Sequence, residues 1–73
     1  MTGEILAVLQ KKGYGFIRDE DGQERFFHAN SVMSGDVKSA ALFTGLEIGM
    51  KVRFKAVEIQ GKGLRAENVE VIV

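Results

Sequence analysis

The stretch Lys12-Gly13-Tyr14-Gly15-Phe16-Ile17 decides how this chain folds. Side chains alternate between the two faces of an extended strand, so Tyr14 and Phe16 share one face. Gly15 and Ile17 share the other face, and Ile17 is a natural core residue. The stretch therefore predicts a strand over residues 13–18 that turns its two aromatic rings outward.

A second pair of rings follows on the next predicted strand. Asp21-Gly22 is a tight-turn signal, which makes the strand over residues 23–28 an antiparallel neighbour of the first. Phe26 and His28 share a face by parity, whereas Phe27 faces the core. We call the resulting surface the aromatic platform, and its members are Tyr14, Phe16, Phe26 and His28.

Three more strands complete the prediction. The apolar run Ile5 to Leu9 predicts a first strand covered on both faces. The alternation of charged and apolar residues from Lys51 to Lys55 predicts a half-buried strand that continues to Ile59, with Phe54 inside. After a Gly61-Lys62-Gly63 turn, Leu64 to Val73 forms the last strand. Five short strands without proline predict an all-β, five-stranded antiparallel barrel of the oligonucleotide-binding type, as a single domain over residues 1–73.

The segment between the third and fourth of these strands predicts a short helix. Asp36 is the expected cap, Val37 to Phe43 the helix, and Gly45 its stop. A helix of this length is unstable alone. It is expected to hold only if Leu42, Phe43 or Leu46 docks on the barrel.

Composition limits the possible chemistry. A chain of 73 residues supports one small core, and the absence of cysteine excludes disulfides and thiolate zinc sites. His28 is the only histidine, so neither a metal nor another cofactor is expected. The N-terminus lacks the basic start of a signal peptide, and the longest apolar run is too short to span a bilayer. We therefore expect a cytoplasmic protein without membrane contact.

Charge is balanced overall but uneven along the chain. Ten basic and ten acidic residues cancel, yet residues 10–18 contain three basic residues and no acid. Residues 51–65 contain five basic residues against one acid. This distribution fits a locally positive face, and it also fits ordinary solvated strand surfaces.

The platform predicts binding of unpaired bases. Each base stacked on an aromatic ring contributes about 1–3 kcal/mol, and any base offers a flat face. Lys12 stands beside the platform and can pair with a phosphate. Gly13 and Gly15 leave room for a ligand backbone or a neighbouring strand.

Two motifs carry a family resemblance. Residues 12–17 resemble the first ribonucleoprotein motif of cold-shock domains, and Phe26-Phe27-His28 resembles the second. The similarity continues through Phe43, Leu46 to Gly49 and Lys62-Gly63, with an insertion around Met33 to Leu42. It implies a five-stranded oligonucleotide-binding barrel that binds single-stranded RNA or DNA, with the platform residues at stacking positions.

The chain also departs from the family pattern. Leu6-Ala7-Val8-Leu9 stands where the family usually has Lys-Trp-Phe-Asn, Ala29 replaces a common ring, and Leu64 replaces an expected proline. About half of the usual stacking surface is missing, which predicts weaker binding or a shorter footprint. Phe43 is either a compensating loop stacker or a docking residue of the inserted helix.

The predicted function is low-specificity binding of single-stranded nucleic acid, as an RNA chaperone or a regulator of transcription or translation. The alternative is a protein–protein adaptor on the same barrel, supported by the apolar first strand, the insertion and the neutral charge. No nucleophile elbow or second histidine indicates an enzyme, no small-molecule substrate is expected, and a monomer is the default. The candidate nucleic-acid-binding residues are Lys12, Tyr14, Phe16, Phe26, His28, Phe43, Lys51, Arg53 and Lys62.

Overall fold

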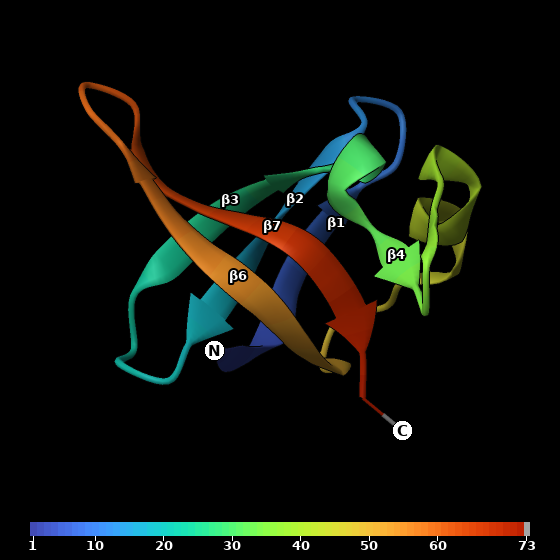
Figure 1. Cartoon of the computed structure of the whole chain (residues 1–73), viewed down its shortest axis with the longest axis horizontal. Coiled ribbons are helices and arrows are strands. Elements are labelled where there is room, and N and C mark those ends of the chain that lie inside the picture. Colours follow the sequence, from blue (N-terminus) through green and yellow to red (C-terminus); the bar gives the residue numbers. More distant parts are fainter. Residues whose placement is uncertain (73) are drawn as a thin grey trace.

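A computed structural model describes residues 1–72 as a closed five-stranded barrel with a small appendage (Figure 1). The predicted end of the last strand, Val73, lies outside these residues. The barrel order is β1-β2-β3-β7-β6. Its strands are β1 (Thr2–Leu9), β2 (Tyr14–Asp19), β3 (Glu24–His28), β6 (Lys51–Ile59) and β7 (Gly63–Val71). The appendage consists of the 3-10 helix η1 (Ala29–Ser31), β4 (Met33–Ser34), β5 (Val37–Lys38) and the 3-10 helix η2 (Ala40–Gly45).

The predicted fold class is confirmed, and the barrel closes at a parallel seam. Neighbouring strands are antiparallel except β3 and β7, which pair in parallel through Phe26 and Arg65. Arg25 reinforces this seam from β3, because its Nη1 donates to the carbonyl of Arg65 at 3.0 Å and to that of Val57 at 3.4 Å. No helix within residues 1–72 is long and apolar enough to cross a membrane.

The core follows the predicted parity. Ile17 and Phe27 are 0% and 1% exposed, and Phe54 is 5% exposed. Gly15 lies between Tyr14 and Phe16 on the inward face, where the Phe27 ring occupies the space that a side chain would need. The room left by Gly15 therefore serves core packing. Gly13 instead belongs to the β1–β2 turn, with a φ of 76° that favours glycine.

Replacing Gly15 with alanine is expected to destabilise the barrel by about 1–3 kcal/mol. The new Cβ would lie 2.5 Å from the Ala7 carbonyl oxygen and 2.8 Å from the Phe27 ring. Neither a backbone oxygen nor a buried ring can move away freely. Gly45→Ala is the matched control, since no atom lies within 4 Å of its added Cβ. Denaturant unfolding should separate the two variants, and equal stabilities would contradict this packing account.

The first strand is less covered than predicted. Within β1 only Ile5 is fully buried, residues 6–8 are half-buried, and Leu9 is 37% exposed. A register shift between Ile5 and Ala7 marks a bulge. Ala7 and Leu9 continue the outer face of β2, and neither is buried, so the expectation of two covered faces was wrong.

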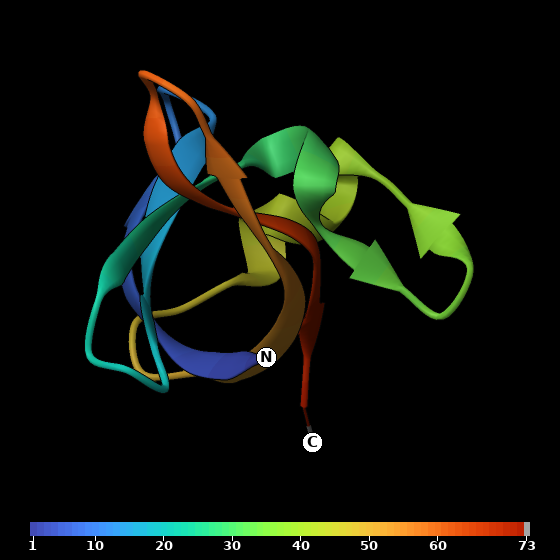
Figure 2. The same cartoon turned by 60° about the vertical axis from the view of Figure 1, so that its left-hand side comes forward.

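The short helix predicted in the insertion is confirmed, but its bounds were wrong: it is the 3-10 helix η2 over Ala40–Gly45 rather than a helix over residues 37–43. Gly35, with a φ of 59°, turns the chain so that Val37 pairs with Ser34, and this short hairpin projects from the barrel (Figure 2). Asp36 therefore lies in a turn. Ser39 caps η2 instead, with its Oγ accepting from the Ala41 N–H at 3.1 Å. Gly45 falls inside this 3-10 helix rather than after it.

Docking of the insertion is confirmed. Phe43 and Leu46 are 2% and 6% exposed, and both belong to the hydrophobic core cluster. Leu42 packs against that cluster while remaining partly exposed. The appendage is thus held to the barrel by side chains, as its short helix requires.

Candidate nucleic-acid interface

The four platform residues lie together on the outer face of β2 and β3. Tyr14 is directly opposite His28, and Phe16 is directly opposite Phe26. Opposed residues of an antiparallel pair point to the same side of the sheet. The parity argument therefore holds for all four residues.

Three of the rings form a contact cluster. The centroids of Tyr14 and Phe26 are 5.2 Å apart, those of Tyr14 and Phe16 are 6.0 Å apart, and those of Phe16 and Phe26 are 6.1 Å apart. Two of these pairs are edge-to-face, an arrangement that aromatic quadrupoles favour. Each of the three rings is half-buried. The cluster is therefore held in place before any ligand arrives.

His28 is the exposed member, and its orientation is fixed by the backbone. Its Nδ1 accepts the N–H of Asn30 at 3.1 Å, which caps η1. A neutral imidazole that accepts at Nδ1 carries its proton on Nε2. His28 therefore has an Nε2–H donor that is not used by this cap.

The outer face extends past the platform onto β1. Leu9 is opposite Tyr14 and Ala7 is opposite Phe16. Both side chains are apolar and neither is aromatic. The face next to β2 is therefore apolar and shallow rather than aromatic.

The interface also includes two arginines, Arg18 and Arg65, that were not among the residues predicted from the sequence. Arg18 follows Phe16 by two residues on β2, so it continues the same outer row, and it is exposed. The Arg65 guanidinium carbon lies 4.6 Å from the Phe26 ring centroid. Strand parity was a sufficient signal for Arg18. Arg65 lies next to Phe26 because β3 pairs with β7, and this long-range pairing could not be predicted from any local sequence pattern.

The other predicted cations differ in position. Lys12 is exposed in the β1–β2 turn, next to the platform, and Lys62 is exposed in the β6–β7 turn. Lys51 pairs with Glu4 at 3.0 Å, and Arg53 pairs with Glu70 at 3.0 Å. Both ion pairs involve strands other than β2 and β3, so neither cation is brought to the platform.

Phe43 does not belong to the interface. Its side chain is 2% exposed and its ring centroid lies 5.9 Å from that of Phe27 in the core. A base cannot stack on a ring that is enclosed in this way. Of the two roles left open for Phe43, the structure supports docking of the insertion.

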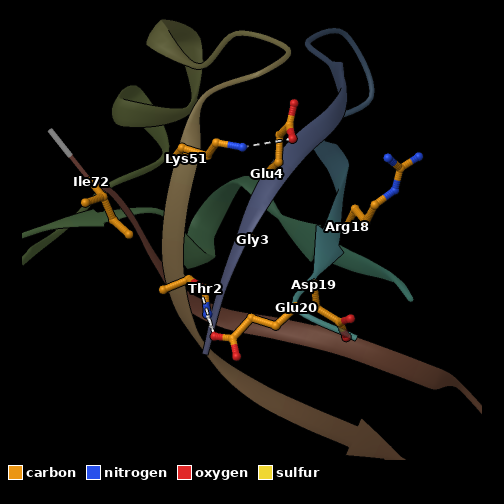
Figure 3. Close-up of a pocket in the computed structure, with 8 residues that line it drawn as sticks. All are labelled: Thr2, Gly3, Glu4, Arg18, Asp19, Glu20, Lys51 and Ile72. Carbon is orange, nitrogen blue, oxygen red and sulfur yellow. Dashed lines mark hydrogen bonds and ion pairs between the residues drawn. The ribbon is translucent and has the colours of Figure 1, made fainter. Parts of the chain in front are cut away.

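A hollow of about 460 Å³ lies beyond Arg18, between the ends of β1, β2 and β6 (Figure 3). Its charged lining residues are Glu4, Asp19, Glu20, Arg18 and Lys51. Asp19 is paired with the buried Arg25 and Glu4 is paired with Lys51, so Glu20 and Arg18 are the charged lining residues without an ion-pair partner within residues 1–72. Glu20 accepts from the Thr2 N–H at 2.7 Å and from the Thr2 hydroxyl at 2.9 Å. These hydrogen bonds lower the pKa of Glu20, which keeps it charged. The hollow has no aromatic residue in its lining on which a base could stack, so the platform is the better candidate interface.

Asp19 anchors this end of the barrel. Burial raises the pKa of its carboxyl, but hydrogen bonds from the Gln23 N–H, the Arg25 side chain and the Asp21 N–H together hold the pKa below its ordinary value. A carboxyl whose pKa is depressed in the folded state stabilises the protein above its unfolded pKa, and this stability is lost as the pH falls through the folded pKa.

The melting temperature should therefore stay level from pH 7 to about pH 5 and fall below about pH 4, near the ordinary aspartate pKa. Asp19→Asn keeps an acceptor oxygen but cannot titrate. Its melting temperature should be lower at neutral pH and should depend less on acid. Thermal unfolding over a pH series tests this, and an unchanged acid slope in the variant would show that other carboxyls control it.

Comparison with known proteins places the chain. Residues 1–72 match the model of the 'Cold-shock' DNA-binding domain. The chain is 41% identical over 71 residues to the major cold shock protein CspA of Pseudomonas aeruginosa, and 37% identical over 71 residues to the cold shock protein CapB of Pseudomonas syringae. Each alignment covers 97% of this chain and 93% of the relative.

A solved structure of Drosophila Unr shares the fold, with a TM-score of 0.64 and 21% sequence identity. The match covers 99% of this chain and 26% of that chain. The family match, the bacterial relatives and the barrel with its outward rings agree, and the chain belongs to the cold-shock domain family, whose members bind single-stranded nucleic acids.

Proposed function

We propose that this chain binds single-stranded nucleic acid across β2 and β3, with bases stacked on the platform and phosphates near Lys12 and Arg18. The observation that carries the proposal is the contact cluster of Tyr14, Phe16 and Phe26 on the outer face. An outward-facing cluster of large apolar side chains marks an interaction site on many soluble proteins. Phe27 and Phe54, by contrast, are turned into the core.

The proposed footprint is short. Ala7 and Leu9 flank the platform on β1, and Ala29 follows His28, so neither side supplies a further ring. Each missing stack removes about 1–3 kcal/mol of binding energy. We infer binding of a few nucleotides at a time, weaker than on a fully aromatic surface.

Stacking that does not depend on base identity suits an RNA chaperone, because such a protein must bind unpaired strands of any sequence. A protein that binds unpaired strands and not duplexes shifts the equilibrium toward unpaired strands by mass action. No nucleotide hydrolysis is needed for this effect. A role in transcription or translation would follow from the same preference.

Titration with a short pyrimidine-rich oligonucleotide, followed by amide chemical shifts, tests the function. Shifts should centre on residues 12–18 and 26–28, and affinity should fall as salt rises. Two or three phosphate contacts give a slope of log K against log salt of about −1.4 to −2.1 for single strands. The same sequence in duplex form is the control and should bind less well. If no amide chemical shift changes at millimolar oligonucleotide, the proposed function is refuted.

The adaptor alternative has one observation in its favour. An apolar hollow of about 240 Å³ lies between the insertion and the barrel, with Met33, Leu42 and Met50 among its lining residues. Nothing in the structure shows what would cover it. Binding of nucleic acid is therefore the function that the geometry supports best.

A further inference from the structure

Arg65 has a hydrogen-bond donor that the protein does not satisfy. Its Nε is buried and has no partner within residues 1–72. A buried N–H without an acceptor is costly, and native structures rarely leave one unexplained. Phe26 holds this guanidinium in place by the cation–π contact, at 4.6 Å from ring centroid to guanidinium carbon.

Arg65 lines a small hollow at the β3–β7 seam, beside the platform. We call it the seam hollow; it measures about 130 Å³, and its lining includes Phe26, His28, Ser31, Ile59, Arg65 and Glu67. Water occupies about 30 Å³ per molecule in the liquid, so the space equals about four waters. That volume suits the edge of one base, presented from a strand stacked on the platform.

Glu67 gives the seam hollow an acceptor. It follows Arg65 by two residues on β7 and so shares its face. Neither residue takes part in an ion pair within residues 1–72. The carboxylate opposes entry of a phosphate and can accept two adjacent N–H groups, while Arg65 can donate to a carbonyl oxygen.

Guanine is the base whose Watson–Crick edge has this pattern, with the O6 acceptor beside the N1–H and N2–H donors. We propose that the seam hollow is a guanine-reading subsite, in which Arg65 donates to O6 and Glu67 accepts from N1–H and N2–H. The inference rests on the proposed function, because the strand must first stack on the platform. It adds a base preference that the flat rings alone do not provide.

The test compares three heptanucleotides that differ at one central position. One is all thymine, one carries guanine and one carries hypoxanthine, which lacks the N2 amino group. A bidentate side-chain contact discriminates by about 5- to 150-fold. We therefore expect guanine to bind at least about fivefold more tightly than thymine, with hypoxanthine in between. The Arg65 Nε–H resonance should shift with guanine and not with thymine.

Two variants separate base reading from charge. Glu67→Gln should remove the preference for guanine over hypoxanthine while leaving the thymine affinity within about threefold. Arg65→Lys keeps the charge but lacks the Nε–H and the planar fork, and it should reduce the preference for guanine over thymine while keeping the preference for guanine over hypoxanthine, which depends on Glu67. If Glu67→Gln instead strengthens all three complexes equally, a phosphate occupies the seam hollow and the inference is overturned.

Two further outcomes distinguish the guanine subsite from the proposed function. Equal affinity of the wild type for the three strands overturns the guanine subsite and leaves the proposed function standing. Failure of all three strands to bind overturns both.

Discussion

Replacing Phe16 and Phe26 together with alanine is expected to abolish binding of short single-stranded oligonucleotides. Two stacked bases contribute about 2–6 kcal/mol in total, which corresponds to a loss of about 30-fold to more than 10,000-fold. The loss of affinity should lie toward the upper end of this range, because the Phe26 ring also contacts two neighbours. Its centroid lies 5.2 Å from the Tyr14 ring centroid and 4.6 Å from the Arg65 guanidinium carbon. Removing it releases both neighbours from their positions.

The fold should survive this double change. Both rings lie on the outer face, whereas Ile17 and Phe27 form the core beneath them. Ile48→Ala is the control for loss of apolar surface, since Ile48 is 73% exposed and outside the platform. Affinity is measured by fluorescence anisotropy and folding by circular dichroism. An unfolded double variant would show that the rings belong to the core, and unchanged affinity would place binding on another surface.

The sequence predicted the barrel because its signals are local. Alternation, the Asp21-Gly22 turn and the Gly61-Lys62-Gly63 turn each act within a few residues, and together they set the face of each side chain. The β3–β7 seam was not predictable in the same way. It joins residues 26 and 65 in parallel, and no turn specifies that register.

The insertion shows where local signals fail. The sequence analysis assigned the cap to Asp36, whereas Ser39, whose residue type is equally favoured at helix N-termini, caps η2 in the structure. The decision comes from Gly35, whose positive φ starts a hairpin, and from Phe43, whose ring is taken up by the core. For a segment this short, tertiary contacts override propensity.

The residues of the candidate site likewise fall into two groups, those predictable from local sequence and those that depend on tertiary contacts. The platform and Arg18 follow from strand parity, which a reader of the sequence can apply. Arg65 and the seam hollow depend on strands that meet only when the barrel closes. Phe43 was named as a candidate binding residue from its family position alone, and that position did not reveal that its ring is buried.

Replacing Arg25 with methionine is expected to destabilise the barrel by about 3 kcal/mol or more. The Arg25 side chain is 9% exposed and its Nε donates to Asp19 Oδ2 at 2.7 Å, while that carboxylate is fully buried. Methionine fills a similar volume but leaves a buried charge without its partner. It also removes the donor that joins β3 to the carbonyls of Arg65 and Val57.

For a domain of this size, a loss of 3 kcal/mol lowers the melting temperature by about 12–24 °C. Arg53→Met is the matched control, because it makes the same change in an ion pair whose arginine side chain is 65% exposed. An exposed pair contributes at most about 1 kcal/mol, and salt weakens it further. Thermal unfolding at low and high salt should therefore show a large, salt-insensitive loss for Arg25→Met and a small loss for Arg53→Met. Similar losses in the two variants would mean that the parallel seam holds without Arg25, and that barrel closure depends on core packing alone.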